Sequence, residues 1–386
     1  MGALEYLSRF QSLISQGRET IPQSTAAEAR ECVSWAAAAL DLEFIDDKEV
    51  IPSFVLVPRE AAPPRLTLFA TWHAETIPVL PAAVEGAERL ALTATLAAVA
   101  AIRGETPVPA SIVVAPAGTQ GSRVVSELLV RHRERLRAPT AFWIRIMPEA
   151  PRRRRIYLGA RGRVVLGIWG DGANPHRIRD ELVRELRAEA YGPRPLDFEL
   201  LRKLGRSQEA LAFLDETIDD PQAVPGEGEE RLRSALFDPR GQVVTPPARH
   251  PDRPRAWIVV EAAESMEPSE VLARVRALAG GAKVEMAEGF FWDRLNIHHP
   301  AIHAEISLSK EVSAGPEIWP MAPWVTPSGV FSRSLGTPLA EWGIPLPPSA
   351  AARAPKQEAF EAIVAEAHEL MRRGAAIPGT PKGTGG

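Results

Sequence analysis

Continuous apolar runs, rather than alternating ones, mark the first part of the chain. Such runs lie at 51–58, 66–70 and 111–115, and segments with helical character lie between them at 25–41, 89–103 and 122–135. A strand that is apolar at successive positions is buried on both faces, which is typical of a parallel sheet covered by helices on both sides. The pattern therefore predicts an α/β core with a mostly parallel sheet.

The pattern changes after residue 157. Strands are predicted at 163–170, 255–261 and 282–286, and helices at 175–190 and 268–279, the first of them with Asn174 in the N-cap position. This order is a split β-α-β arrangement of the ferredoxin-like type. The stretch 192–253 is rich in Pro, Gly and acidic residues, which predicts an irregular insertion.

The α/β pattern then resumes and defines the domain organisation. A helix is predicted at 299–308, a short strand at 338–342 and an amphipathic helix at 357–373. We therefore expect a discontinuous α/β core at 1–157 and 283–375, interrupted by an inserted ferredoxin-like α+β lid or dimerisation domain at 158–282. The Gly- and Pro-rich stretch 376–386 predicts a disordered tail.

Composition and charge narrow the function classes. A net charge of −4 gives no basic field for nucleic acid, so no nucleic-acid partner is expected. No apolar run approaches the roughly 18 residues that a membrane span needs, so no membrane partner is expected either. Cys32 is the single cysteine, which excludes an intramolecular disulfide and a cysteine-based zinc site and favours a reducing, cytoplasmic location.

One strand end carries candidate chemistry. The apolar run at 66–70 continues into Trp72-His73-Ala-Glu75-Thr-Ile-Pro78. A co-catalytic zinc site presents one imidazole and one carboxylate in this way at the carboxyl edge of a sheet. A lone histidine after an apolar run can equally be an ordinary hydrogen-bonding group. His73 and Glu75 are therefore candidate catalytic residues, either active, vestigial or repurposed.

Several landmarks, in order along 5–375, resemble the zinc exopeptidase superfamily of aminoacylase, carboxypeptidase G and carnosinase-type dipeptidases. They are His73-Ala-Glu75, Ala115-Pro-Ala-Gly-Thr-Gln-Gly121-Ser122, Leu158-Gly-Ala-Arg161-Gly162, Ala173-Asn174-Pro175 and Ala352-Arg353-Ala-Pro355. The resemblance implies an α/β core split by a lid that mediates dimerisation. It also implies two zinc ions, held by two histidines and three carboxylates, with a further glutamate as general base.

The resemblance also shows where the chain departs from that ligand set. His73 remains as the first ligand, and the bridging aspartate falls on Ala87 or Glu88. The paired glutamates fall on Gly118 and Thr119, which offer no carboxylate, so the general base is missing. The final histidine ligand falls on Arg353, whose positive charge repels a metal ion.

These losses predict a degenerate member of the superfamily without a metal cofactor, which acts as a binding or scaffold protein or in metal-free chemistry. Its altered pocket would bind an amino-acid-like, peptide-like or carboxylate ligand. The pocket residues would be Thr119, Arg353, Lys356 and Glu88. Any remaining catalysis is expected on C–N amide bonds. We also expect a homodimer or a pairing with a related chain.

The alternative is a metal-dependent dipeptidase or amidohydrolase that has a rearranged ligand set. Its zinc ligands would be His73, Glu75, Glu88 and His303. His299 and His303 also have the i, i+4 spacing that puts two imidazoles on one face of a helix. The two interpretations differ in metal content.

Overall fold

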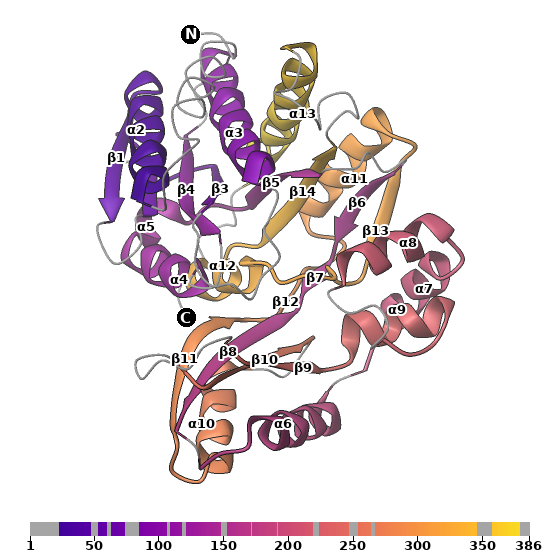
Figure 1. The fold of residues 1–386 in the computed structure, drawn as a ribbon. Coiled ribbons are helices and arrows are strands. Elements are labelled where there is room, and N and C mark those ends of the chain that lie inside the picture. Colours follow the sequence, from indigo (N-terminus) through magenta and orange to yellow (C-terminus); the bar gives the residue numbers. More distant parts are fainter. Residues whose placement is uncertain are drawn as a thin grey trace, which may run out of the picture. The chain divides into compact units, whose positions relative to one another are not determined.

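The computed structural model shows two compact units (Figure 1). It describes residues 23–47, 53–59, 63–73, 85–105, 109–117, 121–147, 153–170, 172–190, 192–218, 224–246, 254–263, 267–345 and 357–378. The core unit comprises Met1–Ile156, Asn296–Glu317 and Phe331–Gly386. The inserted unit comprises Tyr157–Leu295 and Ile318–Val330.

A six-stranded sheet forms the centre of the core unit, in the order β1-β2-β4-β3-β5-β14. The four strands from β4 to β14 are parallel to one another, and β2 and β1 extend the sheet beyond β4 in antiparallel fashion. The mostly parallel sheet is therefore confirmed. Its strands are β1 (Leu42–Asp47), β2 (Ser53–Pro58), β3 (Leu66–His73), β4 (Ala110–Ala117), β5 (Ala141–Met147) and β14 (Leu339–Pro345).

Helices cover both faces of this sheet, as predicted. Phe142 of β5 is in register with Leu68 of β3, so it points away from the face that holds Phe69. On the face of Phe69, the ring of Phe331 packs edge-on at 5.4 Å. On the other face, Gly374 lies so close that a Cβ there would come within 2.4 Å of the Phe142 ring. The absence of a side chain at Gly374 allows this close packing of its helix.

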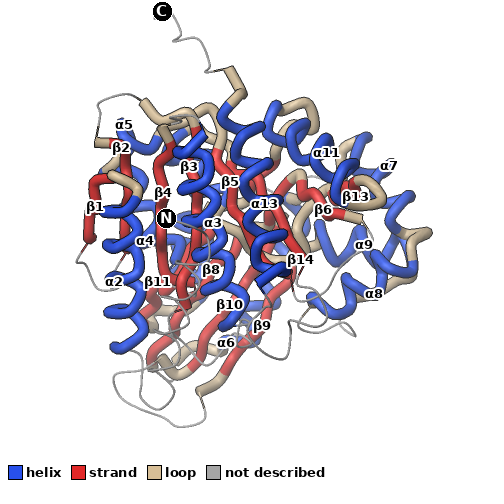
Figure 2. The backbone as a smooth tube through the Cα atoms, turned by 90° about the horizontal axis from the view of Figure 1, so that it is seen from above, coloured by secondary structure: helices blue, strands red, loops and turns tan. Residues whose placement is uncertain are grey.

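The helices predicted at 25–41, 89–103, 299–308 and 357–373 are confirmed, the one predicted at 122–135 is divided into α4 and α5, and α12 is not predicted. α3 and α13 lie side by side across the sheet (Figure 2). The helices are α2 (Gln23–Ala39), α3 (Glu85–Glu105), α4 (Gly121–Arg131), α5 (Arg133–Leu136), α11 (Pro300–Val312), α12 (Ser328–Leu335, which begins in the inserted unit) and α13 (Gln357–Ala375). A buried ion pair fixes α13, because Glu366 accepts from Arg154 Nη2 at 2.8 Å and from Trp342 Nε1 at 3.0 Å. Ile377, in the predicted tail, is buried, so the ordered chain continues past the helix.

The inserted unit has the predicted ferredoxin-like topology. Its antiparallel sheet has the order β11-β8-β10-β9, with chain order β-α-β-β-α-β. The elements are β8 (Gly162–Trp169), α6 (Pro175–Glu189), β9 (Arg240–Val244), β10 (Ala256–Ala262), α10 (Pro268–Leu278) and β11 (Lys283–Phe290). Asn174 caps α6 as expected, since its side chain accepts from the amides of His176 at 3.1 Å and Arg177 at 3.2 Å.

The stretch 192–253 contains three helices, where the sequence predicts an irregular insertion. They are α7 (Pro195–Leu204), α8 (Gln208–Thr217) and α9 (Gly228–Phe237). Pro195 is the first residue of α7, a position where a backbone N–H would have no partner within the helix, so its absence costs no hydrogen bond. Ser207 caps α8. Apolar side chains at helical spacing are buried along all three: Leu200, Leu201, Leu204, Phe213, Leu214, Leu232 and Leu236.

Two short ribbons complete the described fold. β12 (Asp293–Arg294) pairs with β7 (Gly159–Ala160), and β13 (Pro316–Trp319) pairs with β6 (Arg154–Tyr157). Asp197 of α7 is fully buried and accepts from Arg294 Nη2 at 2.5 Å, which ties the helical insertion to β12. Within the described ranges, no helix is both long enough and apolar enough to cross a bilayer.

Candidate functional site

The predicted site lies at the carboxyl edge of the core sheet. β3 and β4 are parallel, and their register places Trp72 opposite Pro116 and His73 opposite Ala117. The two strands therefore end side by side. In the sequence, Gly118 and Thr119 follow Ala117 directly. The carboxyl ends of parallel strands are the usual position of a ligand site in an open α/β sheet.

The structure places some of the predicted site residues, at different levels of detail. For His73 at the end of β3 and Glu88 in the first turn of α3, the structure describes the backbone. His303 is exposed on α11. The remaining predicted site residues lie outside the described residues: Glu75, Thr119, Arg353 and Lys356.

The strand end next to His73 offers no zinc ligand of its own. Zinc sites in proteins use imidazole nitrogen, thiolate sulfur or carboxylate oxygen. The strand that pairs with β3 ends at Ala117 and continues in the chain with Gly118 and Thr119, none of which offers such a donor. Among the described residues, no group of three or more His, Cys, Asp or Glu side chains is arranged to hold a metal ion.

Three tryptophans of the described chain contribute to packing. Trp319 and Trp342 are fully buried. Trp324 packs edge-on against Tyr157 at 5.0 Å and against Phe213 at 5.9 Å. These three side chains therefore serve the packing of the fold, and the candidates for chemistry are polar groups.

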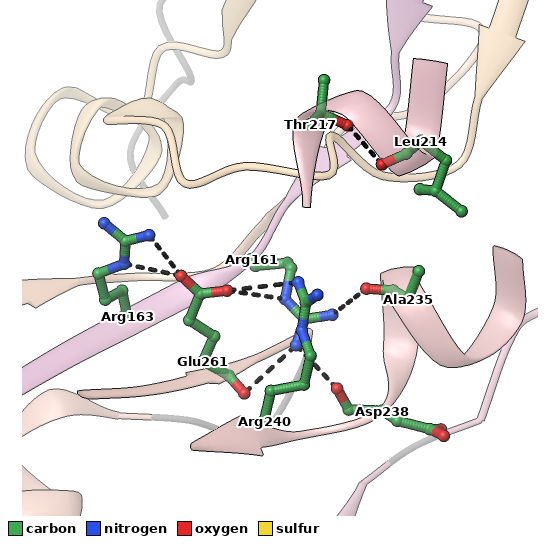
Figure 3. Close-up of polar contacts among 8 residues, drawn as sticks. All are labelled: Arg161, Arg163, Leu214, Thr217, Ala235, Asp238, Arg240 and Glu261. Carbon is green, nitrogen blue, oxygen red and sulfur yellow. Dashed lines mark hydrogen bonds and ion pairs between the residues drawn. The ribbon is translucent and has the colours of Figure 1, made fainter. Parts of the chain in front are cut away.

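Arg161, which sequence analysis singled out within Leu158-Gly-Ala-Arg161-Gly162, forms the centre of a buried polar cluster (Figure 3). Its guanidinium donates to the carbonyl oxygens of Ala235 at 2.8 Å and Asp238 at 2.7 Å, where α9 ends. The last carbonyls of a helix have no partner within the helix and carry partial negative charge. Arg161 therefore supplies hydrogen-bond donors to the carbonyl groups at the end of α9.

Glu261 of β10 is the anion of this cluster. It accepts from Arg163 Nε at 2.8 Å, and its other oxygen lies 3.4 Å from Arg240 Nη2 and 3.7 Å from Arg161 Nε. Burial alone would raise its pKa, but attraction to the three arginines outweighs burial and lowers the pKa of Glu261 to about 2. Burial lowers the pKa of Arg161 to about 9, so the pair is charged at neutral pH.

Two other buried glutamates favour the neutral form. Burial raises the pKa of Glu288 to about 8, with a further contribution from Glu261 that Arg163 opposes. Glu305 of α11 is fully buried, and burial together with Glu341 raises its pKa well above the ordinary value. Neither side-chain oxygen of Glu305 has a hydrogen-bond partner among the described residues. Glu341, by contrast, accepts from Arg145 Nη1 at 2.6 Å.

Sequence reasoning missed these buried carboxyl groups, although a signal exists. Glu305 stands on the face of α11 that also carries Ala301, Ile302 and Leu308, all buried. Glu261 stands within the apolar run of β10. A charged residue at a core-facing position of a helix or strand predicts either an internal ion pair or a neutral acid.

The fold is similar to that of known metallopeptidases. An M20 family metallo-carboxypeptidase, Sso-CP2 from Sulfolobus solfataricus, aligns at a TM-score of 0.70 and 14% identity over 97% of this chain and 99% of that chain. The di-peptidase Dug1p from Saccharomyces cerevisiae aligns at 0.65 and 12% identity, over 97% of this chain and 96% of that one. Human carnosine dipeptidase 1 aligns at 0.63 and 12% identity, over 96% of this chain and 99% of that one.

These likenesses extend along almost the whole chain, and so they confirm the predicted resemblance at the level of the fold. No protein-family model matches the sequence, and no curated protein sequence is similar to it. Since a fold hosts many functions, the activity must be argued from the site.

Proposed function

We propose that this chain is a catalytically degenerate protein of the metallopeptidase fold, which binds an amino-acid-like or peptide-like ligand through an altered pocket. The observation that carries the proposal is the register of β3 and β4, where His73 is paired with Ala117. The chain that follows this strand end is where the resemblance places two acidic residues, and it holds Gly118 and Thr119.

The chemistry of these residues supports binding rather than metal-assisted hydrolysis. Glycine has no side-chain donor, and the threonine hydroxyl stays neutral at physiological pH, so neither serves as a carboxylate ligand or a general base. Arg353, at the position of the last histidine ligand, is a permanent cation. A cation and a hydroxyl suit a carboxylate group, because charge-assisted hydrogen bonds to an anion are among the stronger polar contacts. The ligand class is therefore an amino acid or short peptide with a free carboxylate.

Metal content tests the proposal most directly. Tag-free protein, expressed with zinc in the medium and purified without chelators, is dialysed against metal-free buffer and analysed by plasma mass spectrometry. We expect well under one zinc per chain in the wild type and in His73→Ala alike. Two zinc ions per chain in the wild type, lost in His73→Ala, would refute the proposal and favour the rearranged dipeptidase.

Activity and binding assays complete the test. Alanyl-alanine, N-acetylalanine and alanine are titrated by calorimetry and are also incubated with the protein, with and without added Zn²⁺. We expect binding of at least one of these carboxylates without zinc-dependent release of product. Zinc-dependent hydrolysis that disappears in His73→Ala would again favour the amidohydrolase.

A further inference from the structure

Two exposed histidines lie together at the start of α11. The ring centroids of His298 and His303 are 6.3 Å apart, with 47° between the ring planes. Asn296 fixes the turn that presents His298, since its side chain accepts from the His298 amide at 2.9 Å and its carbonyl from the His299 amide at 2.8 Å. His303 is held one turn into the helix, where its amide donates to the His299 carbonyl at 3.1 Å.

His299 has a different role from the one its i, i+4 spacing suggests. Its Nδ1 accepts from the amide of Ala301 at 3.2 Å, so the imidazole caps the helix. It is also partly buried, and burial lowers the pKa of His299. The helix cap thus occupies one ring nitrogen of His299, and the ring that lies near His303 belongs to His298.

The geometry points to a metal site. Zn–N distances of about 2.0–2.1 Å put each ring centre roughly 3 Å from a shared ion, so two rings on one ion have centres at most roughly 6.5 Å apart. The observed separation of 6.3 Å is close to this limit, which holds for two rings in line with the ion. At a tetrahedral angle the ring centres would be roughly 5 Å apart, so the two exposed side chains would rotate toward each other by about 1 Å. We propose that His298 and His303 form a two-imidazole site for a divalent transition-metal ion on the surface of the core unit.

The ligand type decides which ions the site takes. Imidazole binds Ni²⁺, Cu²⁺ and Zn²⁺, whereas Mg²⁺ and Ca²⁺ prefer oxygen ligands. Two protein ligands leave the other coordination positions to water, so the ion exchanges readily and is removed by dialysis. The site is independent of the pocket under "Proposed function", because it includes neither His73 nor the segment after β4.

Calorimetric titration with NiCl₂ tests the site. The protein is tag-free, treated with EDTA and dialysed. We expect one Ni²⁺ per chain with a Kd between about 1 and 100 µM, corresponding to about −8.2 to −5.5 kcal/mol. His298→Ala and His303→Ala should each weaken binding about tenfold or more, because each removes one of two protein ligands. Mg²⁺ should not compete.

Three control variants separate this pair from other sites. His176→Ala removes an exposed histidine in the first turn of α6. His299→Asn keeps a side-chain acceptor for the cap, and His73→Ala removes the pocket histidine. All three should bind Ni²⁺ like the wild type. The proposal is overturned if the wild type does not bind Ni²⁺, if His298→Ala binds as tightly as the wild type, or if His299→Asn loses binding.

Discussion

Arg161 and Glu261 face each other in the interior of the inserted unit, with Nε of the arginine 3.7 Å from Oε2 of the glutamate. The Arg161 side chain is 0% exposed and that of Glu261 is 16% exposed. Because Arg161 also donates to the last carbonyls of α9, this ion pair joins the helical insertion to the sheet. Removing Glu261 leaves the fully buried Arg161 without its counter-ion, and removing Arg161 leaves the carbonyls of Ala235 and Asp238 without their donor, so both changes are costly.

We therefore expect Arg161→Met and Glu261→Gln each to lower the free energy of unfolding by about 3 to 5 kcal/mol, measured by urea denaturation. Arg184→Gln is the control, since Arg184 is 71% exposed and pairs only at 3.4 Å with Glu181. That variant should change stability by under about 0.5 kcal/mol. Equal, small effects of all three substitutions would show that the cluster does not hold the unit together.

Glu305 predicts a loss of stability as the pH rises. Its folded-state pKa is raised well above 4.5, the ordinary value, by burial and by Glu341. Above pH 4.5 the unfolded chain releases this proton while the folded protein keeps it, so folding becomes less favourable until the pH passes the folded-state pKa. The slope contributed by one such proton is at most about 1.4 kcal/mol per pH unit.

Urea denaturation at several pH values between 5 and 8 measures this effect. We expect Glu305→Gln to flatten the decline of stability with pH, because glutamine fills the same volume and does not ionise. Glu358→Gln, at an exposed position in the first turn of α13, is the matched control and should keep the slope of the wild type. If Glu305→Gln has the same slope as the wild type, Glu305 is not the group that titrates.

Much of the fold could be predicted from the sequence, because apolar periodicity is local information. The continuous runs of β3 and β4 and the cap of α6 by Asn174 are confirmed. The helices α7, α8 and α9 differ from the irregular insertion that the Pro, Gly and acidic residues of this stretch predict. Pro195 begins a helix and buried leucines follow at helical spacing, so the periodicity was the better guide.

The candidate site was less predictable, because it depends on pairs of residues far apart in the chain. Nothing local in the sequence indicates that Arg161 lies beside Glu261, 100 residues away. Nor does the spacing of His299 and His303 reveal that a helix cap already occupies one ring nitrogen of His299. Register does carry over, since the adjacent parallel strands β3 and β4 end together, with His73 opposite Ala117.

The structure changes the surface through which a dimer is expected to form. The sequence predicts that a second chain pairs edge to edge with the strand at 255–261 and the helix at 268–279. In the structure β10 has β8 on one side and β9 on the other, so its hydrogen-bonding edges are occupied. The sheet edge that packs next to α10 is β11, which carries the partly exposed Met286.

We therefore expect any dimer to form through β11 and α10. Light scattering should give about twice the 42.0 kDa mass of the chain at micromolar concentration. Met286→Asp should shift this equilibrium toward the monomer, because it puts a charge into the interface, whereas Val130→Asp, at an exposed position in α4, should not. A wild-type monomer at 50 µM or above would contradict the prediction.

Arg353 is the residue whose substitution best separates a pocket from a scaffold. If it binds the carboxylate of a ligand, Arg353→Ala should weaken binding of that ligand by about 1.5 to 3 kcal/mol, as expected for a charge-assisted hydrogen bond. The melting temperature should stay within about 2 °C of the wild type. Calorimetric titration of the carboxylate that the wild type binds, together with a thermal melt, measures both quantities.

A loss of stability without a loss of affinity would indicate that Arg353 has a structural role. If Arg353 instead pairs with Glu75 or Glu88, Arg353→Ala leaves a carboxylate without its partner and lowers the melting temperature, while ligand affinity stays unchanged. Arg372→Ala, at a position 60% exposed on α13, is the control for loss of a surface arginine and should alter neither quantity. If only Arg353→Ala loses stability and its ligand affinity is unchanged, the anion-pocket hypothesis is wrong and the scaffold function is favoured. The arginine would then stabilise the fold and would not bind a ligand.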